Sequence, residues 1–166
     1  DSPLVNNILG DIKELVRTGE FTLGPPVQEF EEKFAELCGV KHAIGINSGT
    51  DALILILKAL GIGPGDEVIT VPNSFIATAN VIRFVGATPV FVDVDDEYLI
   101  DTNLVKEAMT ERTKAILPVH LTGNPVSISH ISNLYLYYYD SYRQNPFVPV
   151  IEDAAQAVDA EVHGQK

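Results

Sequence analysis

Short apolar runs alternate along the chain with segments whose apolar residues recur at helical spacing. The apolar positions of residues 4–16 recur every three or four residues, which predicts a first helix. A second helix with the same spacing begins at Pro25 or Pro26 and ends before Gly39. Residues 50–60 are apolar almost all round, so we expect this third helix to be buried. Further helices are predicted over residues 75–85, 102–109 and 128–142.

The apolar runs between these helices are short enough to be buried strands. They cover residues 42–46, 67–71, 89–92, 114–119 and 148–151. Strands that alternate with helices are typical of a parallel sheet, because a parallel connection needs a crossover segment. The sequence therefore predicts an α/β fold with a mostly parallel central sheet and helices on both of its faces.

Composition and charge exclude several classes of protein. Eleven Lys and Arg against 23 Asp and Glu give a net charge of −12, which repels phosphate backbones and argues against nucleic-acid binding. The longest apolar run ends at Lys58, far short of the roughly 20 residues that a membrane span needs. No basic segment precedes an apolar stretch at the start, and the single cysteine, Cys38, cannot form an internal disulfide. We therefore expect a cytoplasmic protein without a membrane partner.

Small residues follow the first predicted strand and lead directly into a helix. Ligands of open parallel sheets bind beyond the carboxyl ends of the strands, and this junction lies at such an end. Free N–H groups at Gly49 and Thr50, together with the helix dipole, would favour an anion such as phosphate. Simple capping of the helix by Ser48 or Thr50 explains the same residues. This local pattern leaves both interpretations open.

Two other strand ends carry residues that could bind a ligand. Phe75 follows the strand 67–71, where its ring could stack on a planar ligand or belong to the core. Glu152 and Asp153 follow the strand 148–151, and carboxylates next to a buried strand are costly unless something pairs with them. Helix capping by Asp153 would account for one of them. A ligand cation or a protonated ring nitrogen would account for it better.

The remaining polar candidates at strand ends are a histidine and three acids. His120 ends the strand 114–119 and is either an acid or base or a structural histidine with satisfied nitrogens. Asp93, Asp95 and Asp96 could be metal ligands, but solvated acids are common where a strand runs into a turn. The sequence contains no cluster of His and Cys residues that would suit zinc. We predict no metal site.

Seven short motifs, in a fixed order and spacing, carry a resemblance to a known family. They are Thr22-Leu23-Gly24-Pro25 with Glu29-Phe30-Glu31, Asn47-Ser48-Gly49-Thr50-Asp51-Ala52-Leu53, Gly61-Ile62-Gly63-Pro64-Gly65-Asp66-Glu67-Val68, Phe75-Ile76-Ala77-Thr78-Ala79, Gly86-Ala87-Thr88-Pro89, Pro118-Val119-His120-Leu121 and Glu152-Asp153-Ala154-Ala155-Gln156-Ala157. Together they resemble the nucleotide-sugar aminotransferases of the DegT/DnrJ/StrS family, which are fold-type I pyridoxal-phosphate enzymes. The resemblance covers about residues 21–157.

The resemblance implies a role for several of the residues at the strand ends. Gly49 and Thr50 would donate N–H groups to the phosphate of the cofactor, pyridoxal 5'-phosphate. Phe75 would stack on its pyridine ring, Asp153 would pair with the protonated ring nitrogen, and Gln156 would contact the ring hydroxyl. Thr22 and His120 are weaker candidates for contacts with substrate or with a second subunit.

The family also implies an activity and an assembly. Its members transfer an amino group, usually from glutamate, to a keto-sugar attached to a nucleotide, and their sites lie between two subunits. We therefore expect a homodimer that acts on a nucleotide-linked keto-sugar and an amino donor. In domain terms, residues 1–24 would form an N-terminal helix and arm, and residues 25–166 part of a large cofactor-binding domain.

The sequence departs from the family pattern in ways that leave other functions open. The lysine that forms the Schiff base, and the C-terminal small domain, would lie beyond residue 166, so no catalytic residue is assigned within the chain. Residues 124–147 also leave the pattern. The family includes sugar dehydratases in which histidine replaces that lysine, and this branch remains an alternative. A second alternative is a non-catalytic remnant that serves as a binding or dimerisation module.

Overall fold

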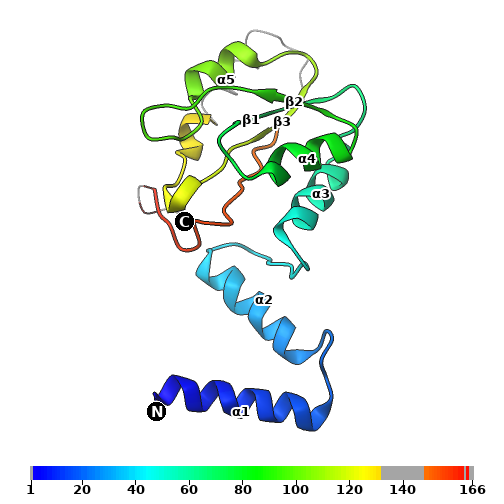
Figure 1. The fold of residues 1–166 in the computed structure, drawn as a ribbon, viewed down its shortest axis with the longest axis vertical. Coiled ribbons are helices and arrows are strands. Elements are labelled where there is room, and N and C mark those ends of the chain that lie inside the picture. Colours follow the sequence, from blue (N-terminus) through cyan, green and yellow to red (C-terminus); the bar gives the residue numbers. More distant parts are fainter. Residues whose placement is uncertain (1, 132–147, 163, 165–166) are drawn as a thin grey trace. The chain divides into compact units, whose positions relative to one another are not determined.

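The computed structural model describes residues 2–131, 148–162 and 164 (Figure 1). The chain divides into two compact units, residues 1–45 and residues 46–166, and each is described here by itself. The domain boundary expected after residue 24 remains a prediction. The predicted helix 128–142 begins as a helical turn at residues 128–131, and its remainder lies outside the described residues.

Two helices make up the first unit, as the apolar spacing predicts. Helix α1 spans Pro3–Thr18, and α2 spans Pro25–Leu37. The side chain of Ser2 accepts a hydrogen bond from the N–H of Leu4 at the start of α1. Gly19 ends α1 in the left-handed conformation, with φ of 73°, and its N–H donates to the carbonyl of Leu15. Local capping residues therefore set both ends of α1.

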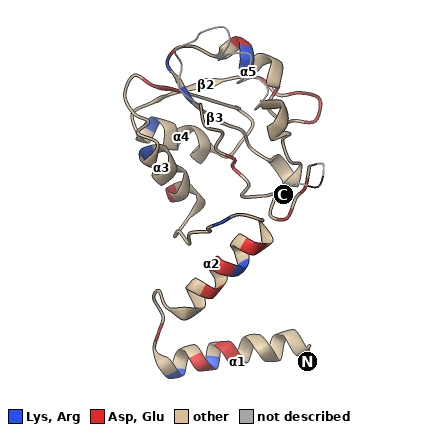
Figure 2. Cartoon of the chain, turned by 180° about the vertical axis from the view of Figure 1, so that it is seen from behind, with Lys and Arg blue, Asp and Glu red and all other residues tan. Residues whose placement is uncertain are grey.

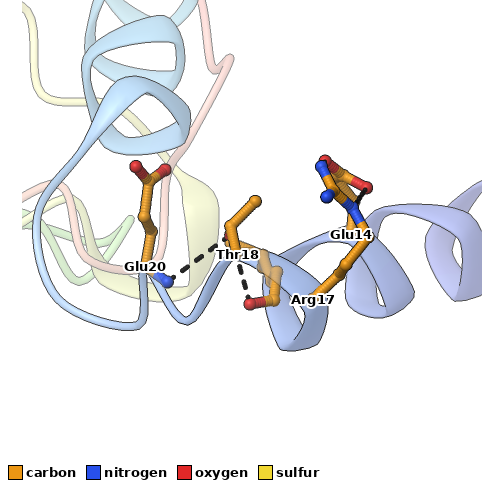
Figure 3. Close-up of polar contacts among 5 residues, drawn as sticks. Glu14, Arg17, Thr18 and Glu20 are labelled. Atoms are coloured by element: carbon orange, nitrogen blue, oxygen red, sulfur yellow. Dashed lines mark hydrogen bonds and ion pairs between the residues drawn. The ribbon is translucent and has the colours of Figure 1, made fainter.

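Ion pairs one helical turn apart lie on the exposed surfaces of both helices. The Arg17 guanidinium donates to both carboxylate oxygens of Glu14, at 2.9 and 2.6 Å (Figure 3). Figure 2 shows further acidic residues along α2, where Glu29 pairs with Lys33. Hydrogen bonds from these cations lower the pKa of Glu14 and of Glu29 below the ordinary value for glutamate. The pairs therefore stabilise the helices above the unfolded-state pKa, and this stabilisation is lost as the pH falls through the lowered pKa.

The second unit alternates helices with parallel strands. Its three strands, β1 (Glu67–Thr70), β2 (Thr88–Phe91) and β3 (Thr113–Leu117), pair in the order β2-β1-β3, and both pairs are parallel. This arrangement confirms the predicted α/β fold with a parallel sheet. The elements are α3 (Gly49–Ala59), β1 (Glu67–Thr70), α4 (Ile76–Phe84), β2 (Thr88–Phe91), α5 (Thr102–Ala108), β3 (Thr113–Leu117) and a short 3-10 turn at Leu121–Gly123.

The sheet continues beyond β3 through the segment 148–153. The N–H of Ile116 donates to the carbonyl of Pro149 at 3.0 Å, and the N–H of Ile151 donates back to Ile116 at 2.9 Å. The predicted strand 148–151 therefore lies parallel to β3. Helices α3 and α4 lie on one side of the sheet and α5 on the other (Figure 1), as right-handed crossovers in opposite directions require.

The core of this unit lies between the sheet and its helices. The central strands are buried on both faces, as Val68, Ile69, Ile116 and Leu117 show with exposures of 0 to 1%. The one acid buried in these strands, Glu67, accepts hydrogen bonds from Thr110 Oγ1 and from the Arg112 guanidinium.

Among the described residues, no helix is both long and apolar enough to cross a membrane.

The predicted strand 42–46 is wrong. These residues belong to no strand, and Ile44 is 77% exposed. A strand is stabilised by hydrogen bonds to a neighbour, and no segment among the described residues pairs with this one.

The predicted burial of the third helix is also wrong, although the helix itself is confirmed. In α3 only Leu53 and Leu57 are buried, whereas Leu55, Ile56 and the residue that caps the helix, Leu60, are 42 to 50% exposed. In the described part of the chain α3 packs against α4. A helix that packs against a neighbour on one side buries only the stripe of side chains on that side, and its other apolar side chains stay in solvent.

Replacement of Gly86 by alanine is expected to destabilise the second unit. The φ of Gly86 is 89°, and a Cβ there would lie 2.9 Å from Cγ of Pro64. We expect Gly86→Ala to lower the free energy of unfolding by at least about 1–2 kcal/mol, from the left-handed backbone alone. Gly61→Ala is the matched control, because Gly61 has φ of 73° and no atom within 4 Å of such a Cβ. Urea unfolding should show a larger loss for Gly86→Ala; equal losses would mean that the Pro64 contact carries no cost.

Candidate functional site

The carboxyl ends of β1, β3 and the segment 148–151 meet at one edge of the sheet. The N–H of Asp153 donates to the carbonyl of Pro118 at 3.0 Å, and the N–H of His120 donates to the carbonyl of Asp153 at 3.1 Å. From the α4 side, the Thr78 hydroxyl donates to Asp153 Oδ2 at 3.3 Å. The edge therefore unites the end of β3, the residues after 151 and the start of α4.

Asp153 is a half-buried carboxylate held by two neutral donors. Besides the hydroxyl of Thr78 on Oδ2, the N–H of Ala155 donates to Oδ1 at 3.3 Å. A turn and not a helix follows, so helix capping does not account for this residue. A carboxylate offers about four acceptor positions, and donors among the described residues occupy two of them here. Asp153 can therefore accept a further hydrogen bond from a cationic donor.

The neighbouring acid, Glu152, is bonded to His120. Its Oε2 lies 3.0 Å from Nε2 of His120, while Nδ1 of the same ring accepts the N–H of Val126 at 2.9 Å. Because Nδ1 accepts, the ring proton lies on Nε2 and points to the carboxylate. His120 is 4% exposed and both its nitrogens are engaged. This geometry is that of a structural histidine, one of the two interpretations left open by the sequence.

The ring of Phe75 lies in solvent at the same edge. Phe75 is the residue that precedes the first turn of α4, and it is 73% exposed. It is therefore not part of the core. A flat apolar surface next to the carboxylate edge is available for stacking against a planar ligand.

The start of α3 offers unpaired N–H groups. Ser48 Oγ accepts the N–H of Asp51 at 3.1 Å, so the capping interpretation is correct for this serine. The N–H groups of Gly49 and Thr50 have no acceptor among the described residues. Capping and anion binding are thus compatible at this helix start, since they use different N–H groups.

The other two predicted contact residues, Gln156 and Thr22, lie in different units of the chain. Gln156 Oε1 accepts the N–H of Thr122 at 2.7 Å, and Thr122 has the unusual φ of 55°. Gln156 therefore holds the turn that follows β3, next to the edge of the sheet. Thr22 is exposed between α1 and α2 in the first unit, so its position relative to this edge is not described.

The sequence assigned no role to Ser74 or Thr78, although Thr78 lies in one of the family motifs. Thr78 is 1% exposed, and its hydroxyl lies 2.9 Å from that of Ser74 while also donating to Asp153. The i, i+4 spacing of two hydroxyl residues around the start of a predicted helix was the available signal. That signal could not reveal the partner, because Asp153 is 75 positions away from Thr78.

Two of the three acids after β2, Asp93 and Asp95, bond to the backbone. Asp93 Oδ1 accepts the N–H of Val94, and Asp95 Oδ1 accepts the N–H groups of Glu97 and Leu99. These carboxylates stabilise the turn that contains them. In the part of the chain that the structure describes, no group of three possible ligands is placed to hold a metal ion.

Three groups of the second unit, taken together, suit one kind of ligand. Free N–H groups at a helix start suit a phosphate, the exposed Phe75 ring suits a flat ring, and the Asp153 carboxylate suits a protonated ring nitrogen. A phosphorylated, planar molecule with a basic ring nitrogen presents all three. The residues present therefore fit such a group.

Comparison with known proteins gives a consistent picture. The family described as the DegT/DnrJ/EryC1/StrS aminotransferase family matches residues 4–166. A curated relative from Acidithiobacillus ferrooxidans, UDP-N-acetyl-3-dehydro-alpha-D-glucosamine 3-aminotransferase, is 47% identical over 165 residues. The match covers 99% of this chain and 42% of that relative. The chain thus spans about two fifths of the length of this relative.

Solved structures match over a similar portion. DesV from S. venezuelae, solved in complex with a ketimine intermediate, has a TM-score of 0.88 and 40% identity, covering 98% of this chain and 42% of that one. NtdA from Bacillus subtilis, solved with bound cofactor PMP, has a TM-score of 0.84 and 38% identity, covering 96% of this chain and 35% of that one.

Proposed function

Because the chain belongs to the DegT/DnrJ/EryC1/StrS aminotransferase family, we propose that it forms the cofactor-binding portion of a sugar aminotransferase. The family uses pyridoxal 5'-phosphate. The complete enzyme would transfer an amino group from glutamate to a nucleotide-linked keto-sugar. The name of the relative from Acidithiobacillus ferrooxidans supports a UDP-linked sugar with a ketone at carbon 3 as this acceptor.

The observation that carries this proposal is the environment of Asp153. Its carboxylate lies at the sheet edge, receives two neutral hydrogen bonds and has acceptor positions left over. A protonated ring nitrogen is a cationic donor of the kind this carboxylate lacks. The exposed ring of Phe75 near the same edge supports a planar partner.

Each residue would have a distinct task toward the cofactor. When bound, pyridoxal 5'-phosphate supplies an electron sink for bonds at the amino-bearing carbon. Asp153 would hold the proton at the ring nitrogen, which maintains that sink. Phe75 would stack on the ring, and the N–H groups of Gly49 and Thr50 would bind the phosphate. Gln156, which follows the segment 148–153, would contact the ring hydroxyl.

Two further parts of the proposal concern contacts beyond the cofactor. We propose that the complete enzyme is a homodimer and that Thr22 contacts substrate or the second subunit. For His120 the structural role is the better supported one, because Glu152 and Val126 engage both ring nitrogens. The Schiff-base lysine is proposed to come from sequence that follows residue 166.

Pyridoxamine 5'-phosphate (PMP) is a suitable probe of this proposal. It carries the same phosphate and ring nitrogen as the cofactor, but its amine cannot form a Schiff base with surface lysines. Titration of the chain with PMP, followed by ring fluorescence, should give saturable binding to one site. Excess inorganic phosphate should compete with PMP. Absence of saturable binding would contradict the proposed function.

Gly49→Pro should weaken PMP binding without removing α3. Proline is favoured at the first position of a helix, and the extended backbone of Ser48, with φ of −158° and ψ of 155°, is compatible with a following proline. The substitution deletes one N–H that would donate to the phosphate, so we expect about tenfold weaker binding. Gly49→Ala is the control, because it keeps the N–H and its Cβ meets no atom within 4 Å. Equal affinity for the two variants would argue against a phosphate at this helix start.

A further inference from the structure

A chain of hydroxyl groups connects the start of α4 to Asp153. Ser74 Oγ lies 2.9 Å from Thr78 Oγ1, and Thr78 Oγ1 donates to Asp153 Oδ2 at 3.3 Å. Thr78 is 1% exposed, so water does not replace these bonds. This chain of hydroxyl groups joins residues at the start of α4 to a segment that is distant in the sequence.

The direction of these hydrogen bonds follows from the chemistry of the groups. A carboxylate can only accept, so the single proton of the Thr78 hydroxyl points to Asp153. The lone pairs of Thr78 then accept the proton of Ser74. Both hydroxyl groups therefore donate in the direction of the carboxylate, an arrangement in which each hydrogen bond polarises the next.

Thr78 also links Phe75 to Asp153. Ser74 and Thr78 flank Phe75 in sequence, and the N–H of Thr78 donates to the carbonyl of Phe75 at 3.0 Å. The backbone of Phe75 is therefore anchored to the residue that binds Asp153. Two groups proposed to hold the same ring thus depend on one buried residue: Asp153 bonds to the hydroxyl of Thr78, and Phe75 bonds to its backbone N–H.

We infer that Thr78 is a positioning residue that fixes the Asp153 carboxylate for the ring nitrogen of the cofactor and sets Phe75 at a constant distance from it. This inference rests on the proposed function, since it assigns Asp153 to the ring nitrogen. Thr78 itself does not touch the cofactor. Its effect reaches the ring through Asp153 and through the backbone of Phe75.

The expected result is a loss of PMP affinity that depends on Asp153. Thr78→Val keeps the shape and burial of the side chain but removes the hydroxyl, and we expect about tenfold weaker PMP binding. Thr78→Ser retains the hydroxyl and should bind PMP nearly as well as the unaltered chain. Thr70→Val is the matched control: Thr70 is 0% exposed and its hydroxyl donates to the Leu117 carbonyl, so this variant loses a buried hydroxyl without touching Asp153.

A double-mutant cycle separates positioning from a general structural role. PMP affinity is measured for the unaltered chain, Thr78→Val, Asp153→Ala and the double variant, with ligand-observed NMR for the weak binders. If Thr78 acts through Asp153, Thr78→Val should cost little once Asp153 is alanine. The inference for Thr78 would be overturned if Thr78→Val lowered PMP affinity equally with and without the Asp153→Ala substitution, or lowered it in neither case. If Asp153→Ala binds PMP as tightly as the unaltered chain, the proposed function itself fails.

Discussion

Asp153→Ala should weaken PMP binding by about two to four orders of magnitude. Removing one member of a buried ion pair typically costs about 3–5 kcal/mol, and about 1.4 kcal/mol corresponds to a factor of ten. The ring would bury the carboxylate that it pairs with, and without Asp153 the protonated nitrogen has no counterion. Asp153→Glu keeps the charge on a longer side chain and should be milder. Fluorescence titration of the three proteins with PMP measures the difference.

Glu152→Ala is the control for this experiment. Glu152 carries the same charge one position earlier, but its carboxylate is bonded to Nε2 of His120. Its removal should therefore leave PMP affinity nearly unchanged, although the buried ring of His120 loses a partner. If Glu152→Ala proved more damaging to PMP binding than Asp153→Ala, the carboxylate would have been assigned to the wrong residue.

Ile116→Ala should lower the free energy of unfolding of the second unit by about 2–5 kcal/mol. Ile116 lies in β3, is 1% exposed and pairs with Ile69 of β1 on one side and Val150 on the other. Its removal leaves a cavity between three neighbouring segments of the sheet. Domains of this size are stable by only about 5–15 kcal/mol, so the variant could lose much of its stability. Urea unfolding followed by circular dichroism measures the change.

Ile76→Ala provides the comparison for the same chemical change in solvent. Ile76 is the first residue of α4 and is 64% exposed. Its replacement should change the free energy of unfolding by no more than about 0.5 kcal/mol. A similar loss for both isoleucines would mean that the sheet between β1 and residue 150 is not the core of the unit.

Periodicity and turn residues were sufficient to locate most elements. The helices at Pro3–Thr18 and Pro25–Leu37, and the strand at Glu67–Thr70, lie within a few residues of the predicted ranges. These elements depend on local features such as capping residues, prolines at helix starts and runs of apolar side chains. The burial of α3 was misjudged because an apolar helix shows what could be buried and not how many neighbours pack on it.

For the candidate site as well, the sequence predicted some features and not others. The sequence by itself determined which chemical groups follow the strands: the small residues at Gly49, the ring of Phe75 and the carboxylate of Asp153. It could do so because parallel strands end at one edge, whatever their order. Whether a strand finds a neighbour is not a local property, and the run at residues 42–46 stayed unpaired among the described residues.

Only the tertiary structure decided which of these groups bond to one another. Thr78 donates to Asp153 across 75 positions, and His120 meets Glu152 across 32, because the segment 148–153 lies beside β3 in one particular register. A shift of that register by one residue would turn every side chain of the segment to the other face. The sequence contains the carboxylates, but the pairing of distant strands places Glu152 against the histidine and Asp153 against the hydroxyl of Thr78.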